Sequence, residues 1–111
     1  MNRLARIVRS STPSSGALFR RQAYGRSGVR EFLRDVLALA NASVQGPRYI
    51  IVGAEVDAQG RKHMKSINRD DFSGKPAYQA IANDHVEPPV RIRYKPVSVE
   101  GKLVGVFEIG D

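Results

Sequence analysis

Residues whose chemistry could support catalysis are few and dispersed along the chain. Glu55 and Asp57 stand two positions apart at the predicted end of a strand, where alternate side chains share one face. Hydrolysis of nucleic acids by two metal ions requires several carboxylates around ions about 3.5–4 Å apart, and this pair has no third acid beside it. His63 and His85 each lack a second nitrogen ligand at metal-binding spacing. We therefore expect no metal site and no catalytic residue.

The sequence also lacks the motifs that hold cofactors. There is no cysteine, which removes disulfides, thiolate nucleophiles and cysteine-rich zinc sites. There is no P-loop and no G-x-G-x-x-G motif, since Gly53 and Gly60 only flank a predicted hairpin. No apolar run approaches the roughly 18–20 residues of a membrane span. We expect a protein with no cofactor and no membrane partner, located in the cytoplasm.

Positive charge is concentrated at the N-terminus. The 111 residues carry a formal net charge of +7. Residues 31–111 hold eleven Lys and Arg against eleven Asp and Glu, so the excess belongs to residues 1–30, which contain no acid. The arginines of that segment are Arg3, Arg6, Arg9, Arg20, Arg21, Arg26 and Arg30. Such an asymmetry is typical of segments that bind polyanions.

Residues 1–16 are interpreted as a flexible basic arm, because they end in the breaker-rich string Ser-Ser-Thr-Pro-Ser-Ser-Gly. Two alternatives stay open. The segment is also compatible with a solvated tail that only aids solubility. It further has the Arg- and Ser-rich, acid-free composition and the small apolar pattern of a mitochondrial transit peptide.

Hydrophobic periodicity predicts one small α+β domain over residues 17–111. The expected element order is β-α-β-β-α-β-β, giving a small mixed β-sheet with two covering helices. The run from Tyr49 to Val56 is apolar on both faces, which is typical of a strand buried from both sides. Strands are predicted over 17–24, 49–56, 61–67, 90–99 and 102–109, and helices over 28–41 and 76–86.

Basic side chains recur on the predicted strands. Arg91, Arg93 and Lys95 must share one face of their strand, because side chains alternate with a period of two. Pro96 changes the apparent parity of the apolar positions, which predicts a bulge or an edge position there. The residues expected to contact sugar and phosphate are Arg20, Arg21, Arg26, Arg48, Arg61, Lys62, Lys65, Arg91, Arg93 and Lys95.

Tyr24 and Tyr49 are candidates for stacking on bases, with burial in the core as the alternative. Nothing in the sequence resembles a set of base-reading side chains, so weak sequence preference is expected. The alternative for the whole basic set is the solvated, charged face of an ordinary sheet.

Several strings also have the order and spacing of a known family. They are Arg30-Glu31-Phe32, Leu39-Ala40-Asn41-Ala42, Gly46 to Gly53, Tyr78-Gln79-Ala80-Ile81, Glu87-Pro88 and the hairpin from Arg93-Tyr94 to Glu108-Ile109. Together, over roughly residues 17–110, they resemble the Schlafen-type AlbA-like domain. The resemblance implies an Alba-like fold and binding of DNA or RNA.

The chain departs from that family at the first strand. The family has an acidic-Phe-Lys triplet where this sequence has Leu18-Phe19-Arg20, so the carboxylate is missing. In relatives with nuclease activity this acid belongs to a metal-dependent carboxylate cluster. This sequence has acids near only the last position of that cluster, Glu55 and Asp57. The resemblance therefore implies binding without intrinsic catalysis.

Two further functions remain alternatives. One is a protein-interaction, regulatory or dimerisation module, which would make a homodimer or a partner domain the binding partner. The weaker one is a residual metal-dependent nuclease. The chain stops directly after its last predicted strand, which suggests a domain excised from a longer protein.

Overall fold

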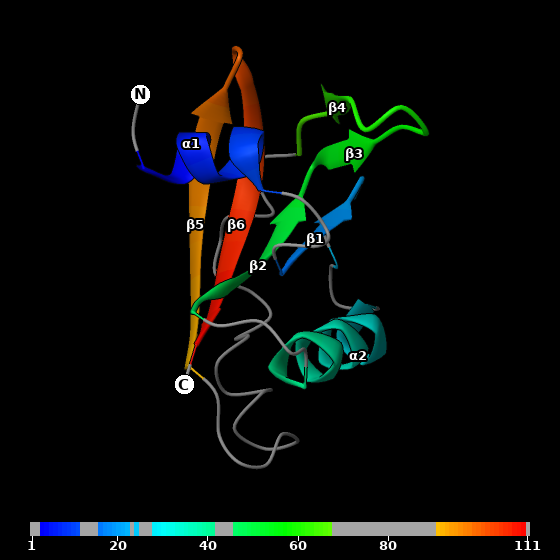
Figure 1. Cartoon of the computed structure of the whole chain (residues 1–111), viewed down its shortest axis with the longest axis vertical. Coiled ribbons are helices and arrows are strands. Elements are labelled where there is room, and N and C mark those ends of the chain that lie inside the picture. Colours follow the sequence, from blue (N-terminus) through cyan, green and yellow to red (C-terminus); the bar gives the residue numbers. More distant parts are fainter. Residues whose placement is uncertain are drawn as a thin grey trace.

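The computed structural model describes residues 3–11, 16–22, 24, 28–41, 46–67 and 91–110. These residues form two helices, a four-stranded sheet in the order β1-β2-β6-β5 and a two-stranded sheet, β3-β4 (Figure 1). The predicted α+β class with a mixed sheet is confirmed, whereas the predicted helix over 76–86 lies outside the described residues. The elements are α1 (Arg3–Ser10), β1 (Ala17–Arg20), α2 (Val29–Ala40), β2 (Arg48–Val52), β3 (Ala54–Val56), β4 (Lys62–Met64), β5 (Arg91–Val99) and β6 (Lys102–Gly110).

The hairpin of β5 and β6 is the longest pairing in the sheet. Its register is continuous from Arg91 opposite Gly110 to Val99 opposite Lys102. Glu100 and Gly101 close it with φ values of 53° and 76°, as a two-residue turn of type I′ requires. Of the two alternatives predicted at Pro96, the bulge is therefore wrong and the edge position is confirmed. Pro96 is accommodated because β5 is an edge strand, where a residue without an N–H is tolerated.

The predicted strand from 49 to 56 is broken at Gly53. This residue has a φ of 89°, a left-handed conformation that glycine adopts without steric cost. Its N–H donates to the carbonyl of Arg20 at 2.7 Å, and its own carbonyl accepts from the N–H of Lys65 at 2.7 Å. A Cβ at this position would lie 2.9 Å from the Ile67 side chain. The chain consequently leaves the main sheet after β2 and forms the separate hairpin of β3 and β4.

The helix α2 covers one face of the four-stranded sheet, as its apolar spacing predicted. Phe32, Val36 and Leu39 point from α2 into a buried cluster with Ile50 of β2 and Phe107 of β6. Tilted and edge-to-face ring contacts add to this packing, for example Phe32 against Phe107 with centroids 5.5 Å apart. This core fixes α2 and the strands beneath it as one unit.

The helix α1 covers part of the opposite face (Figure 1). Ala5 and Val8 are buried there beside Val97 and Val99 of β5, within a second apolar cluster. The interpretation of residues 1–16 as a flexible arm is therefore wrong for Arg3–Ser10. The apolar residues of this segment recur at helical spacing and find a sheet surface to cover, which a solvated tail would not need. Neither described helix is long and apolar enough to cross a membrane.

Candidate nucleic-acid interface

The strand β5 presents a ladder of three cations. Arg91, Arg93 and Lys95 are exposed and lie on the face of the sheet that α1 partly covers, while Ile92 and Tyr94 pack toward α2. Their placement on one face confirms the alternation seen in the sequence. Val97 and Val99 continue on that same face. The side chains on this face of β5 therefore change from basic to apolar where α1 begins to cover the strand, and the alternation of faces continues without interruption.

The helix α1 extends this ladder. Its Arg3, Arg6 and Arg9 are exposed. Arg3 borders a surface depression that is also lined by Arg93 and Lys95 of β5. Thus α1 starts beside the ladder and carries its positive charge onward across the sheet.

The other end of α1 meets the hairpin of β3 and β4. Arg9 lines a second depression together with Arg61 and Lys62. The Lys62 ammonium donates to the Arg9 carbonyl at 2.6 Å and lies 5.3 Å from the centroid of the Phe19 ring. Burial lowers the pKa of Lys62. This lysine both caps the C-terminal end of α1 and holds it against the hairpin.

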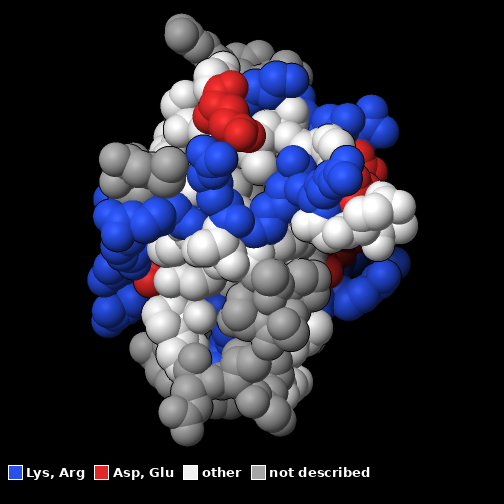
Figure 2. All heavy atoms as spheres, turned by 45° about the horizontal axis from the view of Figure 1, so that its top comes forward, with Lys and Arg blue, Asp and Glu red and all other residues white. Residues whose placement is uncertain are grey.

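We call the resulting surface the basic band. Figure 2 shows Lys and Arg side chains running across the side of the molecule on which α1 and the β3-β4 hairpin lie. Two of the acids next to the described part of the band are held in ion pairs, Glu108 by Arg3 at 3.0 Å and Glu100 by Arg9 at 3.5 Å, and a third, Asp57, accepts from the backbone N–H of Arg61. The members of the basic band are Arg3, Arg6, Arg9, Arg61, Lys62, Arg91, Arg93 and Lys95.

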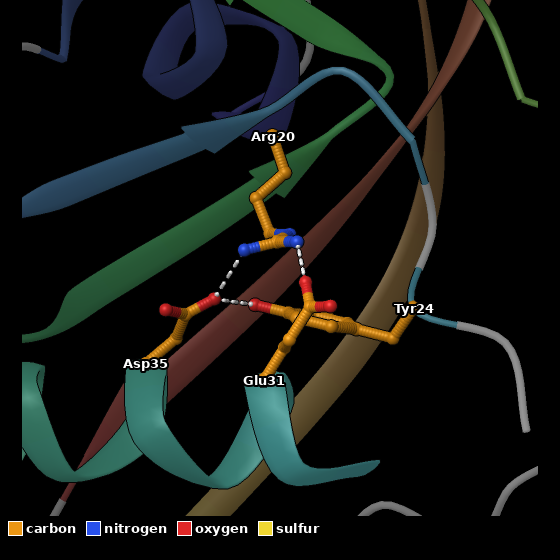
Figure 3. A network of polar contacts seen from close by, with 4 residues as sticks. All are labelled: Arg20, Tyr24, Glu31 and Asp35. Atoms are coloured by element: carbon orange, nitrogen blue, oxygen red, sulfur yellow. Dashed lines mark hydrogen bonds and ion pairs between the residues drawn. The ribbon is translucent and has the colours of Figure 1, made fainter. Parts of the chain in front are cut away.

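Arg20 does not join the basic band. It points to the opposite face of the sheet, where its guanidinium pairs with Asp35 at 3.1 Å and with Glu31, both on α2 (Figure 3). The Tyr24 hydroxyl donates to the same Asp35 carboxylate at 2.5 Å, and the Arg20 guanidinium carbon lies 4.8 Å from the centroid of the Tyr24 ring. This network ties β1 to α2. It neutralises the charge of Arg20 and buries Tyr24, so neither residue is available in the role that the sequence suggested.

Arg48, which the sequence predicted to contact sugar and phosphate, does not join the basic band either. It alternates with Ile50 and Val52 on β2 and therefore lies on the α2 face, with only 8% of its surface exposed. Arg21 is exposed just beyond β1. Lys65 is exposed after β4 and lies 4.0 Å from the Glu55 carboxylate. Arg26 falls outside the described residues.

The acids weighed as catalytic candidates have local partners. One Asp57 carboxylate oxygen accepts from the N–H groups of Gln59 and Arg61, each at 2.9 Å, and the other lies 2.8 Å from His63 Nε2. The bond to His63 is the main reason why the pKa of Asp57 lies below its usual value. Asp57 thereby organises the turn between β3 and β4. Across the described ranges, His, Asp and Glu do not gather in threes that could hold a metal ion.

The sequence pattern places the arginines of α1 only in the predicted basic arm. The signal for a packed helix was present, because Leu4, Ala5 and Val8 fall on one side while Arg3 and Arg6 fall on the other. What the sequence could not provide was the partner surface, since Val97, Val99, Val104 and Val106 lie about ninety residues further along the chain.

A solved structure with a similar fold is known from Nitrosomonas europaea. It is the solution NMR structure of the N-terminal domain of a protein described as a "putative ATP-dependent DNA helicase RecG-related protein". The two align with a TM-score of 0.58 and 17% sequence identity, over 97% of this chain and 71% of the other. At this identity the likeness establishes the fold. No protein-family model and no curated protein matches the chain.

Proposed function

We propose that this protein binds the sugar–phosphate backbone of DNA or RNA through the basic band and performs no chemistry of its own. The observation that carries the proposal is the position of α1. It joins the cations of β5 and those of the β3-β4 hairpin into one surface, in which ion pairs hold Glu108 and Glu100. Among the described residues, eight cations against three neighbouring acids, Glu100, Glu108 and Asp57, favour a polyanionic partner.

Binding would follow from neutralisation of phosphates and release of their counterions. Each phosphate contacted lowers the logarithm of the affinity for duplex DNA by about 0.9 per tenfold rise in salt. The long side chains of the basic band reach phosphates without reading base edges along a groove, so the backbone term would dominate. Weak sequence preference and strong salt dependence are the expected signature.

Two likenesses support a role connected with nucleic acids. The Nitrosomonas europaea protein that contains the similar domain is described as related to a DNA helicase. The sequence strings from Arg30 to Ile109 resemble the Schlafen-type AlbA-like domain, and we propose membership of that family on this basis. The family's first-strand acid is replaced by Leu18, which packs against the core under α2, so the proposed role is binding.

Fluorescence anisotropy with a labelled duplex and a labelled single strand, each at low and at moderate salt, tests the proposal. Micromolar affinity that weakens steeply with salt is expected. Absence of binding even at low salt would contradict it. The protein-interaction or dimerisation module would then become the better account of the basic band.

A further inference from the structure

The sheet face beside α1 contains a row of three residues that differs from the rest of the basic band. Tyr49 of β2 is the register partner of Glu108 of β6, and Glu108 is in turn the partner of Arg93 of β5. All three side chains lie on the face that α1 only partly covers: Arg93 is exposed, and Tyr49 and Glu108 are half-buried. An aromatic ring, a carboxylate and a cation thus stand side by side on adjacent strands.

The surface is hollowed on both sides of this row. One depression, of about 180 Å³, is lined by Pro47, Arg91, Arg93, Glu108 and Gly110. The other, of about 460 Å³, is lined by Arg93 and Glu108 together with Arg3, Leu4, Lys95, Pro96 and Val106. Arg93 and Glu108 line both. They therefore stand between two depressions that lie along β5 beside the start of α1, and we call this stretch of surface the groove.

Charge decides how a strand of nucleic acid would lie in this groove. Arg91, Arg93 and Lys95 recur about 6.6 Å apart along β5, a spacing that suits successive phosphates of an extended single strand. Above β6 the row presents Glu108, a carboxylate already paired with Arg3, which attracts a phosphate less than the ladder does. The backbone must therefore follow the ladder, and the bases must turn inward over β6 and β2. Tyr49 lies about 10 Å from Arg93 across two strand spacings, which is within the reach of a base whose phosphate sits on the ladder.

Glu108 has acceptor capacity to offer such a base. Arg3 contacts both carboxylate oxygens with the same nitrogen, Nη2, at 3.0 and 3.2 Å. A carboxylate has about four lone-pair sites, so this arrangement leaves one or more on each oxygen. Tyr49 lies close enough for Glu108 to add to the effect of burial in raising the pKa of its phenol. A carboxylate held in this way accepts hydrogen bonds from exocyclic amino groups, such as N4 of cytosine.

We infer that the groove along β5 is a subsite for single-stranded nucleic acid, in which the ladder holds the phosphates, Tyr49 stacks on an unpaired base and Glu108 accepts from that base's amino group. This inference rests on the proposed function and adds to it a substrate class and a base preference. A duplex cannot offer unpaired bases to the sheet, so it uses only the cations of the basic band. Stacking on an aromatic side chain is tolerant of base identity, and the preference comes from Glu108.

The test compares two labelled decamers, oligo(dC) and oligo(dU), with a duplex of equal length by anisotropy at pH 7.5. The two strands have the same charge and ring size. Cytosine carries the amino group that would donate a hydrogen bond to Glu108, whereas uracil has a carbonyl oxygen at that position. Wild-type protein should bind oligo(dC) about five- to tenfold more tightly than oligo(dU). Glu108→Leu should abolish this ratio, although removal of one negative charge should strengthen binding to both strands. Glu55→Leu removes the same charge from β3, outside the groove, and should leave the ratio intact.

Tyr49→Leu should weaken binding of both single strands about fivefold or more and leave duplex binding unchanged. Tyr49→Phe keeps the ring and should bind both single strands more tightly than Tyr49→Leu does. Circular dichroism establishes folding first, and if Tyr49→Leu fails to fold, the oligo(dC) to oligo(dU) ratio of Glu108→Leu decides alone. Equal binding of both strands and the duplex by wild-type protein would overturn the inference and leave the proposed function standing. Absence of all binding at low salt would instead overturn the proposed function.

Discussion

Replacement of Arg91 and Arg93 by glutamine isolates the contribution of the β5 ladder. Both side chains are exposed, and the core residues between and after them, Ile92 and Tyr94, remain in place. A matched control exists on the other side of the sheet. Arg30 and Arg34 are exposed on α2, so their replacement by glutamine removes the same two charges far from the basic band. Both variants reduce the net charge from +7 to +5.

The magnitude follows from the number of phosphate contacts. Two contacts to duplex DNA contribute about 1.8 to the slope of log affinity against log salt. At 0.1 M salt, one decade below 1 M, the same two contacts are worth about 1.8 logarithmic units, or about 60-fold in affinity and about 2.4 kcal/mol. For a single strand the coefficient is about 0.7 per contact, which gives about 25-fold. The control pair should change the affinity less than about threefold, because exposed charges farther apart than the Debye length of about 10 Å are largely screened at this salt.

The assay is anisotropy at five salt concentrations for wild type and both variants, after urea unfolding has shown equal stability. The slope is the decisive quantity, since a general loss of attraction lowers affinity without removing specific phosphate contacts. A slope that falls by about 1.8 on duplex DNA for the ladder variant and stays constant for the control supports the assignment. Equal small losses in both variants would refute it. Binding would then depend on net charge and not on the basic band.

Three further predictions concern the groups that position this surface. Val8→Asp places a charge at a fully buried position of α1, so it should lower the free energy of unfolding by about 2–3 kcal/mol and weaken nucleic-acid binding together, measured by urea titration and anisotropy. Asp35→Ala leaves Arg20 and the Tyr24 hydroxyl without this acceptor and should lower the free energy of unfolding by about 2 kcal/mol, whereas Tyr24→Phe should lower it by about 1 kcal/mol. Nucleic-acid affinity should stay unchanged in both variants, because this network lies on the α2 face. A loss of affinity in a folded variant would contradict that placement. Asp57 has a lowered pKa, so its carboxylate stabilises the fold at pH values above the ordinary carboxyl pKa, and this contribution disappears as the pH falls through the lowered pKa. The urea midpoint of Asp57→Asn should therefore lie below that of wild type at pH 7, and the two midpoints should converge in acid. A difference between the midpoints that stays constant with pH would contradict this role of Asp57.

Local patterns sufficed for the elements whose partners are close in sequence. The spacing from Val29 to Ala40 predicted α2, and Glu100-Gly101 predicted the turn of the last hairpin, since both signals are contained within a few residues. The ladder of β5 followed from strand alternation alone. These features needed no knowledge of the rest of the chain.

Features that depend on distant contacts were not predictable in the same way. An eight-residue helix is marginal in isolation, so α1 exists because the apolar surface of β5 and β6 stabilises it. Likewise, Arg48 and Arg20 have the composition of binding residues, and only the pairing of β1 with β2 shows that they face α2. The sequence pattern predicts that Gly53 belongs to one continuous apolar strand. The hydrogen bond that its carbonyl accepts from the N–H of Lys65 shows that the chain turns there.

The net charge of +7 therefore does not by itself locate an interface on this protein. Arg20 contributes to that charge, yet Asp35 and Glu31 neutralise it within a structural network. Arg3 and Arg9 also form ion pairs, but their side chains are 61% and 49% exposed, so a phosphate can compete for them with little desolvation. The distinction between the two faces is one of burial. Under α2, Arg20 is held in ion pairs that join β1 to α2, whereas on the α1 face Arg91 and Arg93 stay exposed because α1 covers only the apolar part of the sheet. The length of α1 thus determines how much of β5 remains open for a ligand, and the open part is the part that carries Arg91, Arg93 and Lys95.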